Sequence, residues 1–153
     1  MSGEKLREVF DKRNPRGAND DRHFIALPSD ALHYVHHVRM SAEKFFLYQL
    51  IIDHYNPKDG YAYPSIERLS VMYSKTPETT SKHLDDLKEV GLIDFPEKGY
   101  YVPLVPLDAE TFYGEHPDAL RNYKDRLKKS EGRRLASAER MQKWRAEQGY
   151  SNG

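Results

Sequence analysis

The chain has 153 residues, 38% of them hydrophobic and 31% charged, which predicts one domain with loosely held ends. It contains no cysteine, so disulfides and thiolate metal sites are excluded. The first residues, MSGEKLREVF, lack the apolar region of a signal peptide, and no run approaches the length of a membrane span. We therefore expect a cytoplasmic protein with no membrane partner.

The formal net charge of +0 hides a division along the chain. Residues 1–40 carry seven Lys/Arg and six Asp/Glu, a net charge of +1. Residues 41–120 carry seven and fourteen, a net charge of −7, and residues 121–153 carry ten and four, a net charge of +6. The chain thus combines an acidic body with a basic tail, and any function assigned to it must accommodate both.

Residues 1–22 are expected to form a flexible arm with one short amphipathic helix, marked by Leu6, Val9 and Phe10. Dimerisation, insertion into a partner's groove, packing on the domain and fraying are all compatible with this helix. The linker that follows contains Arg13 and Arg16, which have the charge to enter a minor groove as homeodomain arms do. Residues Phe24 to Leu27 then predict a short strand that leads into a turn or a brief helix.

Three helices are predicted in the body of the chain from capping residues and apolar spacing. The first begins after Ser41 and runs to about Tyr55, and the second opens at Ser65. The third begins after its N-cap Thr76 and ends at Gly91, which is expected to adopt a left-handed conformation. The apolar residues predicted to share one core are Phe46, Leu50, Ile66, Leu69, Leu84 and Leu87.

The segments LIDF and YYVPL flank the tight turn PEKG, a pattern that predicts a hairpin of two short strands. Helix, short strand, helix, turn, helix and β-hairpin is the order of a winged helix-turn-helix. We therefore expect an α+β fold, mainly α, in which residues 23–106 form a three-helix core with the hairpin as its wing. Residues 107–153 are expected to form a basic tail that is helical or partly disordered.

Four segments support this assignment by family resemblance: FIALPSDAL, MSAEKFFLYQLI, KDGYAYPSIERLS and TPETTSKHLDDLKEVGLI. On these segments the chain resembles the winged-helix domains of plasmid and phage replication initiators, of DnaD-like primosome proteins and of small helix-turn-helix regulators. The resemblance implies that the exposed side of the third helix binds double-stranded DNA, or that the domain self-associates as in the DnaD-like proteins. The chain departs from this pattern at Pro77 and Glu78, where such helices usually carry arginines.

The third helix holds most of the side chains with the chemistry to contact DNA. Threonine and serine hydroxyls can contact phosphates or bases, lysine can reach guanine or phosphate, and glutamate can accept a hydrogen bond from cytosine N4. The wing offers one lysine, for which a phosphate contact and a plain surface turn are both compatible. The candidate DNA-binding residues are Ser65, Lys75, Thr76, Glu78, Thr79, Ser81, Lys82, His83 and Lys98.

Acidic residues argue against DNA contact along the whole of this helix. Asp85, Asp86 and Glu89 lie farther along it, where a recognition helix normally leaves the groove. The alternative interpretation is an ordinary solvated face on a domain that docks a protein. DNA contact is therefore predicted for the first turns of the helix only.

In the tail, Leu120, Tyr123 and Leu127 predict a first helix, Gly132 is expected to interrupt it, and Ser137 is expected to cap another. Three roles fit a basic extension of this kind: a non-specific DNA contact, a partner-binding helix, or an arm that lies against the acidic body of the same chain.

Metal binding and catalysis find little support in the sequence. His33 and His37 have the i, i+4 spacing of two metal ligands on one helix face, but no third ligand is evident, so no metal site is expected. The sequence contains neither a phosphate-binding glycine loop nor a nucleophile elbow, so we expect no cofactor and no enzymatic activity.

The leading hypothesis is a sequence-specific DNA-binding protein, a small regulator or replication-initiation protein of a plasmid, phage or integrative element. The alternative is an adaptor of a replication or primosome complex whose DNA affinity comes from the basic tail. A homodimer and a replication or transcription protein partner are compatible with both.

Overall fold

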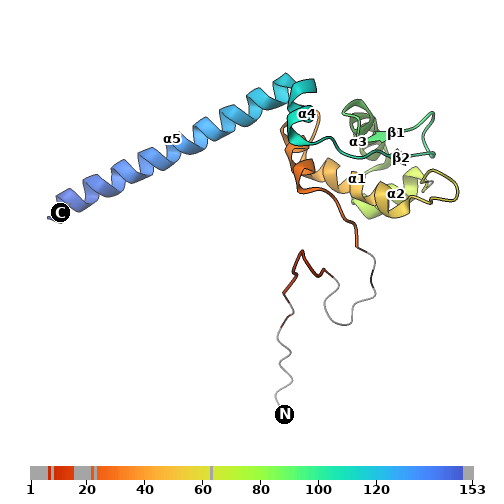
Figure 1. Ribbon diagram of the computed structural model, residues 1–153, viewed down its shortest axis with the longest axis horizontal. Helices are drawn as coiled ribbons and strands as arrows, with labels where there is room; N and C mark the ends of the chain where they lie inside the picture. Colours follow the sequence, from red (N-terminus) through yellow and green to blue (C-terminus); the bar gives the residue numbers. More distant parts are fainter. Residues whose placement is uncertain (1–6, 8, 16–21, 23, 63, 150–153) are drawn as a thin grey trace, which may run out of the picture.

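The computed structural model describes residues 7, 9–15, 22, 24–62 and 64–149. A small domain with a long helix that projects away from it makes up most of the molecule (Figure 1). The elements in chain order are the 3-10 helix η1 (Ser29–His36), α1 (Ala42–His54), α2 (Ile66–Tyr73), α3 (Pro77–Glu89), β1 (Ile93–Asp94), β2 (Val102–Pro103), α4 (Ala109–Glu115) and α5 (Pro117–Glu147).

The starts of the three body helices are fixed by the predicted capping side chains. Ser41, Ser65 and Thr76 each accept a hydrogen bond from the backbone N–H three residues farther on, at 3.2, 3.1 and 3.1 Å. Such a cap satisfies a donor that the helix leaves unpaired and is worth about 1 kcal/mol. All three predicted helix starts are therefore confirmed.

The end of α3 leads directly into the wing. Gly91 has a φ of +82°, and the Leu92 N–H donates to the Leu87 carbonyl at 3.0 Å, as in a Schellman motif. Strands β1 and β2 are antiparallel and form the predicted hairpin. Ala62 exchanges two backbone hydrogen bonds with Tyr101, at 2.7 and 2.9 Å, so the segment before α2 also lies against the wing.

The core lies between the three body helices and the wing, and it includes the predicted Leu69, Leu84 and Leu87, all fully buried. The prediction for Phe46 is wrong, because this side chain is 49% exposed. Helix α1 contacts α2, α3 and β2. Its apolar residues occur on every side, so their spacing did not identify the buried face. The residues that α1 buries are Phe45, Leu47, Tyr48 and Ile51.

Two predictions for the N-terminal part are not met. Residues 24–27 do not form a strand, because the described sheet consists of β1 and β2 and neither pairs with this segment. Val9 and Phe10 are exposed and are not helical, while Leu6 lies outside the described residues. The brief helix expected after residue 27 is present as η1.

The packed unit extends past residue 106, because the start of the basic tail contributes to the core. Phe112 is fully buried, and its ring centroid lies 4.3 Å from that of Tyr34 in η1. The Tyr34 hydroxyl also accepts a hydrogen bond from the Leu107 N–H at 2.9 Å. Ala119 in α5 is buried as well. Helix η1, α4 and the first turns of α5 thus form one packed group with the body.

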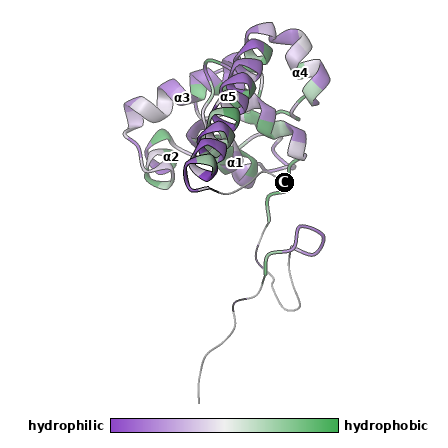
Figure 2. Ribbon diagram, turned by 90° about the vertical axis from the view of Figure 1, so that its left-hand side faces the viewer, coloured by the Kyte–Doolittle hydropathy of each residue, from purple (hydrophilic) through white to green (hydrophobic). Residues whose placement is uncertain are grey.

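Helix α5 is continuous through Gly132, so the expected interruption is wrong, and Ser137 lies inside the helix instead of capping a new one. A glycine in a helix costs about 1 kcal/mol relative to alanine, and the neighbouring arginines, glutamate and leucine favour a helix enough to offset it. With 31 residues, α5 is about 46 Å long at 1.5 Å per residue. In Figure 2 the ribbon of α5 is coloured mainly as hydrophilic residues.

Replacement of Gly132 by alanine is expected to stabilise the projecting part of α5 by about 1 kcal/mol. The added Cβ meets no atom within 4 Å, so only the helix propensity changes. Slower amide hydrogen exchange in residues 126–140 would confirm this. The matched control is Gly91→Ala, which places a side chain at a positive φ and is expected to destabilise the domain by about 1–2 kcal/mol. Unchanged exchange around residue 132 would contradict a continuous helix.

No helix in the described part of the chain has both the length and the apolar character needed to cross a bilayer.

Candidate nucleic-acid interface

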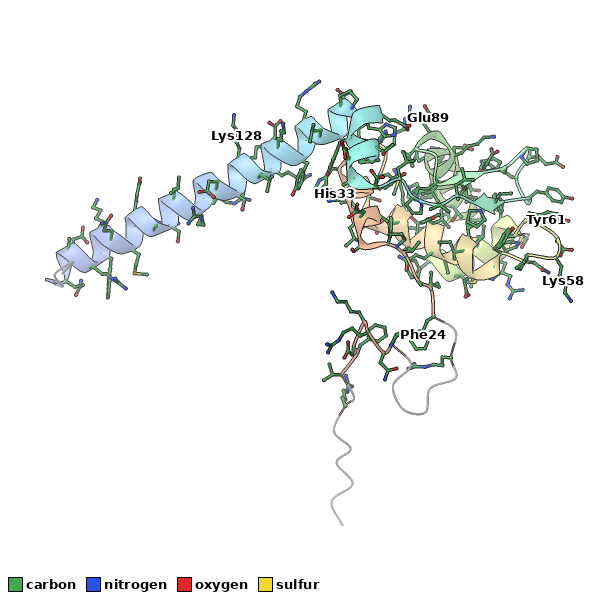
Figure 3. The ribbon with its side chains drawn as sticks, in the orientation of Figure 1. Phe24, His33, Lys58, Tyr61, Glu89 and Lys128 are labelled. Atoms are coloured by element: carbon green, nitrogen blue, oxygen red, sulfur yellow. The ribbon has the colours of Figure 1, made fainter. Side chains whose placement is uncertain are left out.

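The first turns of α3 present a mixed polar surface. Glu78 and Lys82 are exposed, whereas Thr79, Ser81 and His83 are half-buried. Figure 3 shows Glu89, at the other end of α3, on the side of the domain from which α5 departs. Glu89 therefore lies at the opposite end of α3 from Glu78 and Thr79, whereas Asp85 lies only one turn from Ser81.

The two N-cap hydroxyls have structural roles. Ser65 caps α2, and Thr76 caps α3 while donating its own proton to the Thr79 hydroxyl oxygen at 3.1 Å. Because Thr79 Oγ1 accepts in this pair, its proton is free to be donated to an external acceptor. A phosphate or a base oxygen is such an acceptor. Among these three hydroxyls, Thr79 is thus the best placed to contact DNA.

Lys98 joins the wing to α3. Its Nζ donates to the Ser81 carbonyl at 3.0 Å and to the Ser81 hydroxyl, and it forms an ion pair with Asp85 Oδ2 at 3.2 Å. These contacts fix the wing relative to the helix. They also place the Lys98 charge beside a carboxylate, which weakens its attraction for a phosphate.

A second acidic residue of α3, Asp86, and Lys75 just before the helix have ion-pair partners outside α3. Asp86 forms ion pairs with Lys44 at 3.0 Å and with Arg39 at 3.5 Å, and the Lys44 and Asp86 side chains are only 16% and 20% exposed. Lys75, just before α3, forms an ion pair with Glu43 of α1 at 3.1 Å. Asp86 and Lys75 therefore hold α3 against the start of α1, and the charges of Asp85 and Asp86 are engaged in contacts within the molecule.

His83 connects α3 to α2. Its Nδ1 lies 2.9 Å from the Tyr73 hydroxyl oxygen. Burial lowers the pKa of His83, and burial also raises the pKa of Tyr73 to about 12. At neutral pH the tyrosine hydroxyl is therefore the donor and the neutral imidazole the acceptor, which leaves the ring proton on Nε2. His83 accordingly adds no positive charge to the candidate interface.

Lys82 differs from the other candidate lysines. It is exposed, and within the described residues it forms no ion pair or hydrogen bond. Thr79 lies three residues before it, so the two side chains share one face of the helix. Lys82, Thr79 and the N-terminus of α3 together form a small surface that can contact phosphate and base edges.

Sequence reasoning missed Arg39 and Lys44 as the partners of Asp86. They come from the segment before α1 and from α1 itself, more than 40 residues away in the chain, and no local motif links them to α3.

The two histidines with metal-ligand spacing are directed to different neighbours. They were expected on one face of an α-helix, but η1 is a 3-10 helix, in which i and i+3 align instead. His33 Nδ1 lies 2.5 Å from the Tyr113 hydroxyl, whereas His37 Nδ1 accepts from the Arg39 N–H at 3.0 Å. No group of three potential metal ligands occurs among the residues that the structure describes.

In the N-terminal arm, Arg13 forms a local ion pair with Asp11 at 3.1 Å, and this contact lowers the pKa of Asp11. Arg13 is still highly exposed. Arg16, the other residue considered for a minor groove, lies outside the described residues.

A three-helix core whose third helix is flanked by an antiparallel hairpin is a winged helix-turn-helix, a class of DNA-binding domain. In agreement, a family model described as a helix-turn-helix domain matches residues 38–93, little more than a third of the chain. The match begins just before α1 and ends in β1, so η1, α4 and α5 lie outside it. Neither the curated proteins nor the solved structures contain a significant match to the chain.

Proposed function

We propose that the chain binds double-stranded DNA sequence-specifically through the first turns of α3. The observation that carries this proposal is the free charge of Lys82 beside the free hydroxyl proton of Thr79 on a helix-turn-helix domain. In the major groove, a lysine can bond guanine O6 or N7, and a threonine can contact a base or a phosphate.

The internal ion pairs of α3 support this role by fixing the helix. Asp86 is held by α1 and Asp85 by the wing, so α3 is braced from two sides. Contacts made by a preorganised helix cost less ordering entropy on binding than contacts made by a mobile one. The acidic residues thus support DNA contact by positioning α3, although they do not touch DNA themselves.

The biological role that we propose is that of a small regulator or a replication-initiation protein of a plasmid, phage or integrative element. The four sequence segments that resemble replication initiators and small regulators support it. We further propose that the protein works in the cytoplasm without a cofactor or catalytic activity. Where the DNA site contains two repeated half-sites, we propose that the protein binds it as a homodimer.

A second candidate function is a protein–protein adaptor of a replication complex. The pairing of Lys75 with Glu43 and of Lys98 with Asp85 favours it, because these pairs reduce the positive charge that α3 presents. In that case α3 would contact a protein surface, and DNA affinity would reside in α5.

The two proposed functions are distinguished by whether substitutions in α3 reduce the preference of the protein for its selected duplex over a mixed-sequence duplex. A preferred duplex is first selected from a randomised library, and its affinity is compared with that of a mixed-sequence duplex by fluorescence anisotropy. Lys82→Ala and Thr79→Ala are each expected to reduce the preference by about 1–3 kcal/mol, the usual worth of a good base contact. Glu89→Ala, an exposed change at the far end of α3, is the matched control and is expected to leave the preference intact.

Unchanged discrimination in both variants would assign α3 to a protein surface and favour the adaptor. Failure of the full chain to enrich any sequence would exclude sequence-specific binding altogether.

A further inference from the structure

The cations of the body and those of α5 are used differently. In the body, five of the eight lysines and arginines from Arg39 to Lys98 form ion pairs with acidic residues, namely Arg39, Lys44, Lys75, Lys88 and Lys98. In the described part of α5 two ion pairs occur, Arg121–Asp118 and Arg134–Glu131. Most of the lysines and arginines of α5 therefore have no ion-pair partner among the residues that the structure describes.

Four of these cations form a row, which we name the basic stripe: Arg126, Lys129, Arg133 and Arg140. Their spacings of three, four and seven residues place them on one face of the helix. All four are exposed, and none forms an ion pair or hydrogen bond with any residue that the structure describes. From first to last the stripe runs about 21 Å along the helix at 1.5 Å per residue.

The beginning of the stripe lines a groove between α5 and residues 35–40. Arg126, Lys129 and Arg133 form one wall, and Asp125 is the acidic residue in the lining. Asn122, one turn before Arg126, donates to the His36 carbonyl at 3.2 Å and so fixes the wall in place. The stripe thus continues the helix face that docks on the domain.

The opposite wall of the groove adds no charge at neutral pH. His36 and His37 line it, and burial lowers the pKa of both, so both imidazoles are neutral at pH 7. The positive charge of the groove therefore comes from α5.

One of the three roles considered for the basic tail, an arm that lies against the acidic body, fits the structure poorly, and the partner-binding role is restricted to partners other than a second α5. Helix α5 leaves the domain and projects away from it, so beyond its first turns it does not lie against the acidic body (Figure 1). Pairing with α5 of a second copy would bring together two segments that each carry a net charge of +6 over residues 121–153. Like charges at close range oppose such an association.

We propose that the basic stripe binds the phosphate backbone of duplex DNA, a contact independent of sequence that adds to the one made by α3. This inference rests on the proposed DNA-binding function. A duplex carries one negative charge per about 1.7 Å of its axis, so a rigid row of unpaired arginines and lysines meets several phosphates along its length. Because the stripe is one-sided, the other faces of α5 should contribute little.

The test compares two variants of the full chain that lose the same charge. The stripe variant carries Arg126→Gln, Lys129→Gln, Arg133→Gln and Arg140→Gln. The matched control carries Arg121→Gln, Lys124→Gln, Lys128→Gln and Arg145→Gln. Figure 3 shows Lys128 on the upper side of α5, roughly opposite the stripe by helical periodicity. Circular dichroism first verifies that both variants keep their helix content.

Affinity for a 36-base-pair mixed-sequence duplex is measured by fluorescence anisotropy between 50 and 200 mM KCl. The slope of log K against log salt is expected to fall by about 0.9 per lost phosphate contact, hence by up to about 3.6 in the stripe variant. In the control variant we expect a fall of less than about 1.

Equal falls in the two variants would mean that only net charge matters and would overturn the proposal. An unchanged stripe variant would overturn it too and would leave a protein partner as the occupant of the stripe. These outcomes are distinct from failure of the proposed function, which is read from discrimination between the preferred and mixed duplexes.

Discussion

Replacement of Leu84 by alanine is expected to lower the free energy of unfolding by about 2–5 kcal/mol. Leu84 is fully buried in α3, one turn from the equally buried Leu87, and it packs in the core shared with α1 and α2. The change removes three side-chain carbons and leaves a cavity that close-packed neighbours fill only in part. Urea denaturation, followed by circular dichroism, measures the loss.

The matched control is Leu127→Ala. Leu127 lies on the projecting part of α5 and is 51% exposed, so the same chemical change should alter the free energy of unfolding by less than about 0.5 kcal/mol. If Leu84→Ala were as mild as Leu127→Ala, the assignment of α3 as a packed helix would fail. The exposed face proposed to contact DNA would then be wrong as well.

The body helices and the wing could be predicted from the sequence because their signals are local. Ser41, Ser65 and Thr76 bond the backbone within their own first turn, and Gly91 is required by a positive φ at the end of α3. Each of these signals lies within a few residues of the boundary that it sets. The α+β winged fold is confirmed for the same reason.

Features that depend on distant parts of the chain could not be predicted. Phe46 was assigned to the core because α1 is apolar on all sides, and only its packing against α2, α3 and β2 selects the buried face. Gly132 was expected to end a helix, but a single glycine costs less than its helix-forming neighbours contribute.

At the candidate site, too, only the features that depend on nearby residues could be predicted from the sequence. The exposure of Lys82 and the hydroxyl of Thr79 follow from the phase of α3, which the sequence defines. The engagement of Lys98 with Ser81 and Asp85, and of His83 with Tyr73, joins different elements and has no local signal. These partners show which candidate side chains are already engaged within the molecule, and the sequence alone did not reveal them.

Replacement of Phe112 by alanine is expected to cost about 3–5 kcal/mol, although this residue lies beyond the domain boundary predicted at residue 106. Phe112 is fully buried, and its ring contacts those of Tyr34 and His116 at centroid distances of 4.3 and 5.0 Å. Thermal and urea unfolding should detect the loss as a single cooperative transition at lower stability. Trp144→Ala, at a half-exposed aromatic residue of α5, is the control and should have little effect.

A pair of truncations tests the same boundary without creating a cavity. A chain that ends at residue 130 keeps Phe112 and Ala119 in place and is expected to unfold as the full chain does. A chain that ends at residue 106 loses both, together with the Leu107 N–H that donates to the Tyr34 hydroxyl. It is expected to be unfolded or severely destabilised, because a buried tyrosine then loses both its aromatic neighbour and its donor. If the shorter chain were as stable as the longer one, α4 would be an appendage. Helix α5 would then lack the rigid base that its basic stripe needs to meet DNA at a fixed angle.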